Sequence, residues 1–532
     1  MKKLPVGIQT FRKIIEDNCV YVDKTQYIYN LINGASCYFL SRPRRFGKSL
    51  LLDTIGEVFN GNKELFEGLF IYESDYDFKK YPVIRLDMGG ISNQTSESMK
   101  ESLLAELRYL AEEEGLVATG ASPGDLFKRL IRDLNKKHGE RVVVLIDEYD
   151  KPILDHINNL EQAEANRQAL RELYGILKTM DQFLRFTFIT GVSKFTKTSI
   201  FSGLNNLIDI TMTKDFANIC GIEVESLDEF FGEHISDLSK LDEFKLYDDL
   251  QGEILTWYDG YSWDGARRVI NPFGLLTFFM QKRFGSYWYV SGSPKFLIDL
   301  IKKNPDMYTG FGSLVISEHM MDSVEIDRIT VAPLLFQTGY LTVKEVLLTS
   351  GSHEYLLEIP NLEVREAFNM QIIAGLTENS DALTGAIYRR IRESLKAGDL
   401  AGVLDVLKSL FASIPYELQV NKEAYYHSIF YAIMTVLGFN IDAEVSVSRG
   451  RIDAVLELDD KVYVLEFKYK DCAFDAEPEA KQKLFAEALE EAAAQIKGRG
   501  YADKYKNSGK AVYQAAFAFL GRDDIEMKVV GE

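Results

Sequence analysis

Short apolar runs alternate with polar loops along the first third of the chain. The run Ala35–Leu40 has the length of a buried strand, and Leu50, Leu51 and Leu52 begin a segment that fits the inner face of a helix. The stretch 41–49 between them, Ser-Arg-Pro-Arg-Arg-Phe-Gly-Lys-Ser, is polar. The pattern therefore predicts a strand, a loop and a helix in direct succession.

Further apolar runs in the same part predict four more strands. A long helical stretch, 96–137, separates the first of these strands from the second, and the four are Tyr81–Asp87, the segment Arg141–Asp150, Phe186–Gly191 and Leu207–Thr213. One strand thus lies between the loop and the acidic segment, and the strand after that segment ends in the polar Thr190. This order is typical of nucleotide hydrolases in which the polar tip senses the terminal phosphate.

The residues of the loop have the chemistry of a phosphate site. Gly47 allows a tight turn, the start of the next helix presents free N–H groups to an anion, Lys48 reaches terminal phosphates and Ser49 offers a hydroxyl to Mg²⁺. Arg42 stands where the usual motif begins with glycine. This loop therefore predicts a nucleoside triphosphate as ligand, although a basic helix start without a ligand is the alternative for the stretch taken alone.

The acidic segment favours the first interpretation. A hydrophobic strand that ends in the adjacent carboxylates Asp147 and Glu148 supplies what Mg²⁺ and an attacking water both require.

Near the start of the chain, Asp23 and Lys24 follow a short apolar stretch. Contact with the base or ribose is one interpretation of this pair, but we expect an exposed turn.

The last quarter of the chain shows a second regular pattern. Apolar spacing predicts a helix from Glu423 to Leu437, ended by Gly438, and a later alanine-rich helix. The predicted elements are, in order, helix 423–437, strands 443–447, 451–458 and 461–470, helix 479–497 and strand 512–520. This is an αβββαβ series.

Asp459 and Asp460 can form a two-residue hairpin turn between the second and third of these strands. In that register Asp453 lies opposite Glu466, and Lys468 lies on the same face because strand side chains alternate. Like charges directly opposite each other repel, but a Mg²⁺ ion between them would cancel both and act as a Lewis acid on a phosphodiester. Lys468 would orient or deprotonate the attacking water. The alternative is an exposed hairpin of mixed charge.

Composition and charge limit the classes of protein that fit. The 532 residues suggest about three domains, and no stretch approaches the ~20 apolar residues of a membrane helix. The start of the chain lacks an apolar core of signal-peptide length, so we expect a cytoplasmic protein. Four dispersed cysteines indicate reduced thiols. The net charge of −19 argues against broad coating of nucleic acid, so any such contact would be a local patch.

Residues 1–215 resemble the AAA-ATPase-like domain of a bacterial family. The shared signatures are Tyr-Val-Asp-Lys-Thr at 21–25, Arg-Pro-Arg-Arg-Phe-Gly-Lys-Ser at 42–49 and Ile-Asp-Glu-Tyr-Asp at 146–150. The resemblance implies a P-loop NTPase with a parallel sheet of AAA/ASCE type. It also implies an ATP site with Lys48 on the phosphates, Ser49 and Asp147 on Mg²⁺, and Glu148 polarising water. The cofactor-binding set that we predict is Arg44, Arg45, Phe46, Gly47, Lys48, Ser49, Asp147 and Thr190, with Arg44 and Arg45 alternatively as solvent-facing arginines.

The hairpin resembles the PD-(D/E)xK nuclease superfamily. Gly-Arg-Ile-Asp at 450–453 and Leu-Glu-Phe-Lys at 465–468 carry the likeness, with Ile452 in place of the proline of the name. The resemblance implies a restriction-endonuclease-like fold, catalytic roles for Asp453, Glu466 and Lys468, and Mg²⁺ or Mn²⁺ as the metal. It also implies Glu423 as an auxiliary metal ligand and Gln495 as a supporting residue. A helix-start carboxylate and a surface amide are their respective alternatives.

Together these patterns predict an α/β protein in three parts. The parts are the ATPase-like domain 1–215, a helical or winged-helix-like connector 216–370, and the nuclease-like domain 371–532 with its core at 421–520. The predicted function is an ATP-driven or ATP-gated nuclease that acts on nucleic acid. A non-catalytic nucleotide switch that binds a protein partner is the alternative. A homo-oligomer is also possible, for which Arg185 is a candidate to reach a neighbour's nucleotide.

Overall fold

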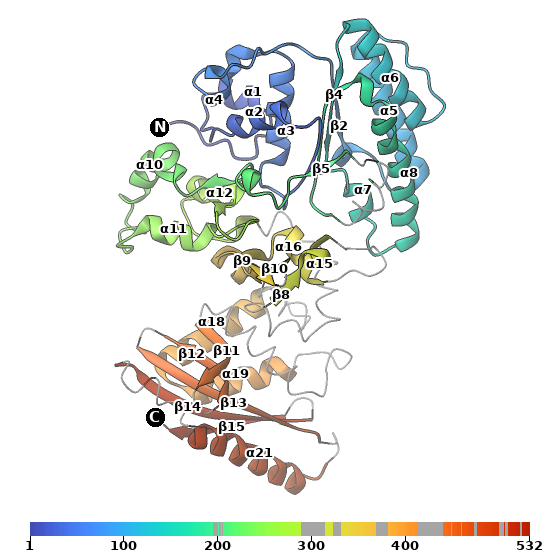
Figure 1. Ribbon diagram of the computed structural model, residues 1–532. Coiled ribbons are helices and arrows are strands. Elements are labelled where there is room, and N and C mark those ends of the chain that lie inside the picture. Colours follow the sequence, from blue (N-terminus) through green and yellow to red (C-terminus); the bar gives the residue numbers. More distant parts are fainter. Residues whose placement is uncertain are drawn as a thin grey trace. The chain divides into compact units, whose positions relative to one another are not determined.

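The computed structural model divides into two compact units, each described here by itself (Figure 1). The first holds residues 1–292 and 313–362, and the second holds 293–312 and 363–532. The structure describes residues 1–194, 201, 204, 206–288, 314–322, 331–349, 351–368, 381–412, 440–447, 450–458, 460–472, 476–499, 505, 509–521 and 524–531. Within these ranges, no helix is both long and apolar enough to cross a membrane.

A five-stranded parallel sheet forms the centre of the first unit. Its strands are β1 (Cys37–Ser41), β2 (Val83–Asp87), β3 (Val142–Asp147), β4 (Leu184–Gly191) and β5 (Ile208–Asp209). They run in the order β2-β3-β4-β1-β5, and every neighbouring pair is parallel. All five predicted strands are present, and β4 is inserted between the strand before the loop and the acidic strand. Both faces of β1 and β3 are buried, as expected for continuous apolar runs in a parallel sheet.

Helices cover both faces of this sheet (Figure 1). On one side lie α1 (Phe11–Glu16), α2 (Thr25–Asn33), α3 (Lys48–Phe59) and α4 (Phe70–Glu73), and on the other α5 (Ser96–Glu113), α6 (Pro123–His138), α7 (Lys151–Leu154) and α8 (Leu160–Thr179). The predicted helical stretch 96–137 is therefore two helices. The break occurs because Gly115 adopts a positive φ of 61° and because Ser122 caps a new helix that has Pro123 at its first turn.

The rest of the first unit, residues 216–292 and 313–362, is called the connector here. It contains the helices α10 (Ser226–Leu238), α11 (Leu250–Tyr258), α12 (Pro272–Gln281), α15 (Glu318–Asp322) and α16 (Val331–Thr338). A small pair, β6 (Ile222–Glu223) with β7 (Val269–Ile270), and an antiparallel sheet of β8 (Leu314–Ser317), β10 (Ser352–Glu358) and β9 (Thr342–Thr349) complete it. An aromatic-rich core packs α10, α11 and α12 together.

The second unit is built on a five-stranded sheet in the order β11-β12-β13-β14-β15. The strands are β11 (Asn440–Val447), β12 (Gly450–Glu457), β13 (Lys461–Lys470), β14 (Ala511–Leu520) and β15 (Asp524–Gly531). Only β13 and β14 are parallel to each other. The predicted order of strands is confirmed, whereas β15 was not expected.

Helices also lie on both faces of the second sheet. The helix α21 (Pro478–Arg499) packs on the face that carries Val462 and Val464, while α18 (Asp381–Ala397) and α19 (Leu400–Ala412) pack on the other. Two contacts identify that other face: the Tyr463 hydroxyl reaches the Leu395 carbonyl, and Phe411 meets Phe519 edge to face. The alternation of β13 therefore places Glu466 and Lys468 on the α21 side.

The hairpin of β12 and β13 has the register that the sequence predicts. Ala454 pairs with Leu465 and Glu457 with Val462, and the Leu458 N–H donates to the Lys461 carbonyl at 2.8 Å. One step further along this register places residue 453 opposite residue 466.

We expect cysteines at these two positions to cross-link. Directly opposed residues of an antiparallel pair have Cα atoms roughly 4.5–5.5 Å apart, within the range of about 4.4–6.8 Å that a disulfide spans. The variant D453C/E466C, in a C472S background that removes a half-exposed native thiol, should oxidise to a disulfide detected by peptide mass spectrometry. The diagonal pair D453C/K468C serves as the control, and its preferential closure would show a register shifted by two residues.

Candidate functional site

Polar side chains meet where the parallel strands of the first unit end. Leu40 and Ser41 pair with Thr190 and Gly191, and Asp87 pairs with Asp147 in the neighbouring ladder. Because all these strands run in the same direction, their carboxyl ends share one edge of the sheet. The loop after β1, the acidic residues after β3 and the polar tip of β4 are therefore brought together, which is the usual position of a ligand site in an open α/β sheet.

The loop after β1 leads directly into α3. Gly47 is its left-handed residue, with φ of 91°, and Lys48 is the first residue of the helix. The Lys48 ammonium is buried and donates to the carbonyl oxygens of Arg42 and Pro43, each at 2.9 Å. Burial lowers the pKa of Lys48, and the nearby Asp147 opposes that shift. A lysine held inside the loop in this way is placed to transfer its hydrogen bonds to phosphate oxygens.

Asp147 and Glu148 lie beside this lysine but differ in environment. Asp147 is 3% exposed and accepts from the hydroxyl of the fully buried Thr190. The Glu148 N–H also donates to Asp147, at 3.0 Å, and Glu148 has a positive φ of 51°. Burial, reinforced by the charge of Asp147, raises the pKa of Glu148. The pair therefore combines a fixed carboxylate suited to a metal with a more basic one suited to accept a proton.

Arg42, which replaces the first glycine of the usual motif, is fully buried. Its guanidinium donates to four carbonyl oxygens, those of Ser41, Thr211, Phe216 and Ala217, at 2.9–3.2 Å. It also stacks on the Trp263 ring at 3.9 Å, and burial lowers its pKa to about 10. Arg42 thus ties the start of the loop to the end of β5 and to the connector instead of facing a ligand.

Four aromatic side chains of the connector contact the loop, and we call Tyr261, Trp263, Phe273 and Trp288 the aromatic cradle. Phe46 is fully buried, with ring centroids 4.7 Å from Tyr261 and 5.5 Å from Trp263. The exposed Arg45 lies over Phe273 at 4.8 Å, and the indole N–H of Trp288 donates to the Arg44 carbonyl at 2.9 Å. The Phe46 side chain therefore packs in the aromatic cradle, and it also lines the apolar pocket described next.

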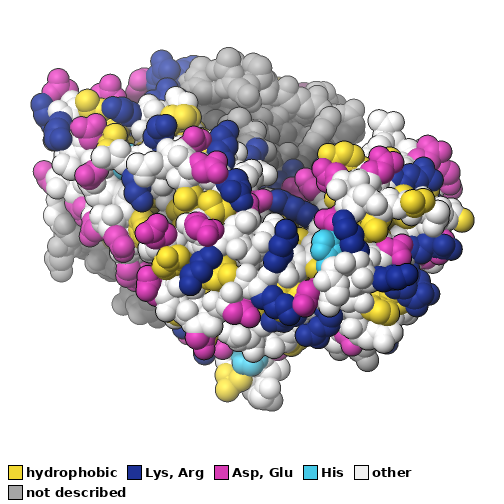
Figure 2. Space-filling model, turned by 90° about the horizontal axis from the view of Figure 1, so that it is seen from above, with side chains coloured by type: hydrophobic (Ala, Val, Ile, Leu, Met, Phe, Trp, Pro, Cys, Tyr) yellow, Lys and Arg dark blue, Asp and Glu magenta, His cyan; other side chains and the backbone are white. Residues whose placement is uncertain are grey.

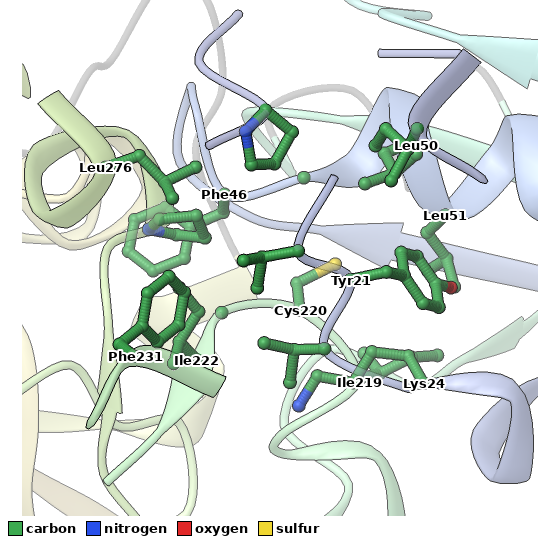
Figure 3. Close-up of a pocket in the computed structure, with 17 residues that line it drawn as sticks. Tyr21, Lys24, Phe46, Leu50, Leu51, Ile219, Cys220, Ile222, Phe231 and Leu276 are labelled. Atoms are coloured by element: carbon green, nitrogen blue, oxygen red, sulfur yellow. The ribbon is translucent and has the colours of Figure 1, made fainter. Parts of the chain in front are cut away.

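The loop borders two adjoining hollows. The polar cavity, about 350 Å³, is lined by Gly7, Gln9, Arg44, Arg45, Lys48, Ser49, Glu148, Lys151 and Phe273, among others. The apolar pocket, about 100 Å³, is lined mainly by hydrophobic side chains from the N-terminal segment, α3, residues 219–222, α10 and α12 (Figure 3). In Figure 3, Leu276 and Phe231 face it from one side and Tyr21 and Leu51 from the other. Gly47 and Leu50 line both hollows, so the two hollows adjoin at the loop.

The motif at 21–25 is not the exposed turn that we expected for its Asp-Lys pair. Lys24 is 8% exposed and lines the apolar pocket, where its ammonium pairs with Glu223 at 2.9 Å. Asp23 accepts from the backbone N–H groups of Thr25 and Phe70, both at 2.7 Å. Phe70 lies 47 residues from Asp23 and Glu223 lies 199 residues from Lys24, which is why local composition indicated only a turn.

Three other residues complete the account of this unit. Lys151 and Asp87 were not among the predicted site residues, although Lys151 lines the polar cavity and Asp87 ends the strand beside Asp147. The position of Lys151 three residues after Glu148 was the available signal. Arg185 lies at the start of β4, at the edge away from the site, and its guanidinium sits over Phe59 and Tyr81.

In the second unit, Glu466 and Lys468 come together at the middle of β13. Glu466 is fully buried, and the Lys468 ammonium lies 3.5 Å from its carboxylate while donating to the Phe467 carbonyl at 3.0 Å. The neighbouring residues on β14 are Ala516 and Ala518, whose small side chains are buried in the core beneath α21. Asp453 lies in β12, next to the last registered pair, and its side chain lies outside the described residues.

The two supporting residues differ in what the structure shows. Glu423 lies outside the described residues. Gln495 is half-buried on α21, one turn beyond Glu491, which pairs with Lys470 at 2.7 Å. Because α21 runs antiparallel to β13, this turn brings Gln495 toward the level of Lys468. Across the described ranges, no three His, Cys, Asp or Glu side chains form a group that could hold a metal.

Comparisons with known proteins match both the first and the last part of the chain. A family model described as a predicted AAA-ATPase matches residues 5–201, and one described as the PD-(D/E)XK nuclease superfamily matches residues 421–528. A protein of Azotobacter chroococcum mcd 1, described as an uncharacterized protein in the vnfD 5' region, is 37% identical over 528 residues, or 97% of this chain and 96% of that protein.

Two solved structures are similar at 11% identity. The Aeropyrum pernix ORC2 protein in ADPNP-ADP complexes matches 68% of this chain and 98% of its own with a TM-score of 0.28. Drosophila ORC bound to AT-rich DNA and Cdc6 matches 77% of this chain and 71% of its own with a TM-score of 0.22. By its relative of 37% identity and its two matched domains, the chain belongs to a bacterial AAA-ATPase-like family that carries a C-terminal PD-(D/E)XK nuclease superfamily domain.

Proposed function

We propose that the first unit binds and hydrolyses ATP with Mg²⁺, and that the second unit cleaves phosphodiester bonds of nucleic acid, DNA foremost, with Mg²⁺ or Mn²⁺. The observation that carries the first half is the meeting of Lys48, Asp147, Glu148 and Thr190 at one strand edge beside the polar cavity. We also propose that the protein acts in the cytoplasm. Its three proposed parts are residues 1–215, 216–370 and 371–532.

The two hollows at the loop fit the parts of a nucleotide. The apolar pocket suits a purine ring, which buries apolar faces, and the polar cavity suits the phosphates, since Arg44, Arg45, Lys48 and Lys151 line it. Ser49 and Asp147 provide the oxygen ligands that Mg²⁺ prefers. The bound ion would polarise the terminal phosphoryl group, and Glu148 would accept the proton of the attacking water.

The buried charge on β13 supports the nuclease half of the proposal. A fully buried carboxylate is costly unless a cation compensates it, and Glu466 has Lys468 at 3.5 Å. A metal held between Glu466 and Asp453 would complete that compensation and activate a phosphodiester, with Lys468 positioning the water. Glu423 and Gln495 remain proposed supporting residues.

Any contact with nucleic acid is proposed as a local patch. The protein carries a net charge of −19, and on the face shown in Figure 2 the basic and acidic side chains of the described residues are interspersed. Nucleic acid held by few phosphate contacts would dissociate at moderate salt.

We also propose that ATP binding regulates access to the nuclease site. Assembly of several copies of the chain is compatible with this scheme.

Removing the Lys48 side chain should weaken nucleotide binding. Because a charge-assisted hydrogen bond is worth roughly 1.5–3 kcal/mol, K48A should weaken ATP affinity by about tenfold or more, measured by calorimetry on the full chain. The E148Q variant should bind ATP normally yet hydrolyse it about 10²- to 10⁴-fold more slowly. Equal ATP affinity in K48A and wild type would contradict the phosphate role of this loop.

The pH dependence of hydrolysis should reflect the raised pKa of Glu148. Glu148 must be deprotonated to accept a proton, so kcat/KM should fall as the pH drops through its pKa. Because that pKa is raised, the fall should begin at a higher pH than the ordinary glutamate value of about 4.3 would give. A profile of kcat/KM against pH measures this, since it reports the free enzyme. An acid limb at the ordinary value would contradict it.

Nuclease activity should depend on the β13 pair and on a divalent metal. We expect D453A, E466Q and K468A each to reduce cleavage of plasmid, linear or single-stranded substrate to background, and chelation to do the same to wild type. Calorimetry with Mn²⁺ should show metal binding by wild type and its loss in D453A. Addition of ATP to wild type and to K48A tests the gating. Wild type that binds no metal and cleaves none of these substrates would favour the non-catalytic switch.

A further inference from the structure

Lys151 occupies a position in the polar cavity that the roles assigned above do not use. It is the first residue of α7, and its N–H donates to the Glu148 carbonyl at 3.0 Å. Its side chain lines the cavity together with Glu148, Lys48 and Ser49. The ammonium and the carboxylate that would accept the proton of water therefore belong to a single turn of the chain.

In this structure the Lys151 ammonium is paired with Asp155. Its distances to the two carboxylate oxygens are 2.7 and 3.0 Å, and the lysine side chain is 31% exposed. Asp155 also accepts from the Asn93 amide at 3.0 Å. An exposed pair four residues apart contributes little to stability, and α7 has only four residues to stabilise. The lysine can therefore exchange this partner for a stronger anion at small cost.

The positions of the apolar pocket and the polar cavity indicate which end of a bound nucleotide would lie beside Lys151. The apolar pocket includes Gly47 and Leu50 but none of Lys48, Glu148 and Lys151, whereas the polar cavity includes all five. A nucleotide with its base in the apolar pocket thus crosses the loop and extends its last phosphate toward Glu148. Lys151 lies at that end.

We propose that Lys151 is a γ-phosphate ligand, which leaves Asp155 when ATP binds and donates to the terminal phosphate. The proposal rests on the ATP function stated above and adds a discriminating residue to it. ADP lacks the phosphate that Lys151 reaches, so the ammonium stays on Asp155 when ADP is bound. Lys151 then distinguishes ATP from ADP and neutralises charge beside the attacked phosphorus.

The test is the ratio of affinities for a non-hydrolysable ATP analogue and ADP, measured by calorimetry on the full-length chain. We expect K151A to weaken binding of the analogue about tenfold and to leave ADP affinity within about twofold, because only the γ-phosphate contact is lost. D155N should move the ratio the opposite way, since it keeps the oxygen that Asn93 contacts but removes the competing charge. K151R should restore part of the preference.

Two controls, an exposed lysine elsewhere in the chain and the wild-type protein, distinguish the possible outcomes of this test. Lys136 is exposed on α6, so K136A should change neither affinity. If K151A weakens the analogue and ADP equally, or neither, Lys151 has only a structural role and this inference is overturned while ATP binding stands. If wild type binds neither nucleotide, the proposed function and this inference both fail.

Discussion

Parallel pairing of β4 between β1 and β3 is the constraint on which the first site depends. The backbone ladder places Thr190 beside Leu40 on one side, and the strand of Asp147 on the other. The residues at the ends of these strands therefore lie at the same edge of the sheet, although no local sequence pattern connects them. These strands are buried on both faces, so the apolar layers on either side of the sheet hold this edge in place.

The loop at this edge is held by the connector as much as by its own helix. Arg42 crosses from β1 to the carbonyls of 211–217 and stacks on Trp263, and the indole of Trp288 holds the Arg44 carbonyl. An isolated glycine-rich loop would need none of these contacts. The buried arginine and the aromatic cradle therefore join the backbone of this loop directly to the connector.

The second unit buries a carboxylate, that of Glu466, inside its sheet. Helix α21 covers one face with alanine and other small or apolar side chains, and β14 contributes Ala516 and Ala518 next to Glu466 and Lys468. The opposite face carries aromatic stacks such as Tyr463 with Tyr513. Apolar side chains therefore pack on both faces of this sheet.

The sequence by itself determined the five strands of the first sheet, four of the five strands of the second and the register of the β12–β13 hairpin, because these follow from short-range periodicity and from a turn that joins neighbours. It also indicated Lys48, Asp147 and Glu466 through motifs of a few residues. Only the tertiary structure decided that Arg42 is an internal anchor, that Lys24 is buried on Glu223, and which side chains line the two hollows. Those contacts join residues up to about two hundred positions apart, and their formation depends on how whole layers pack, which no local pattern records.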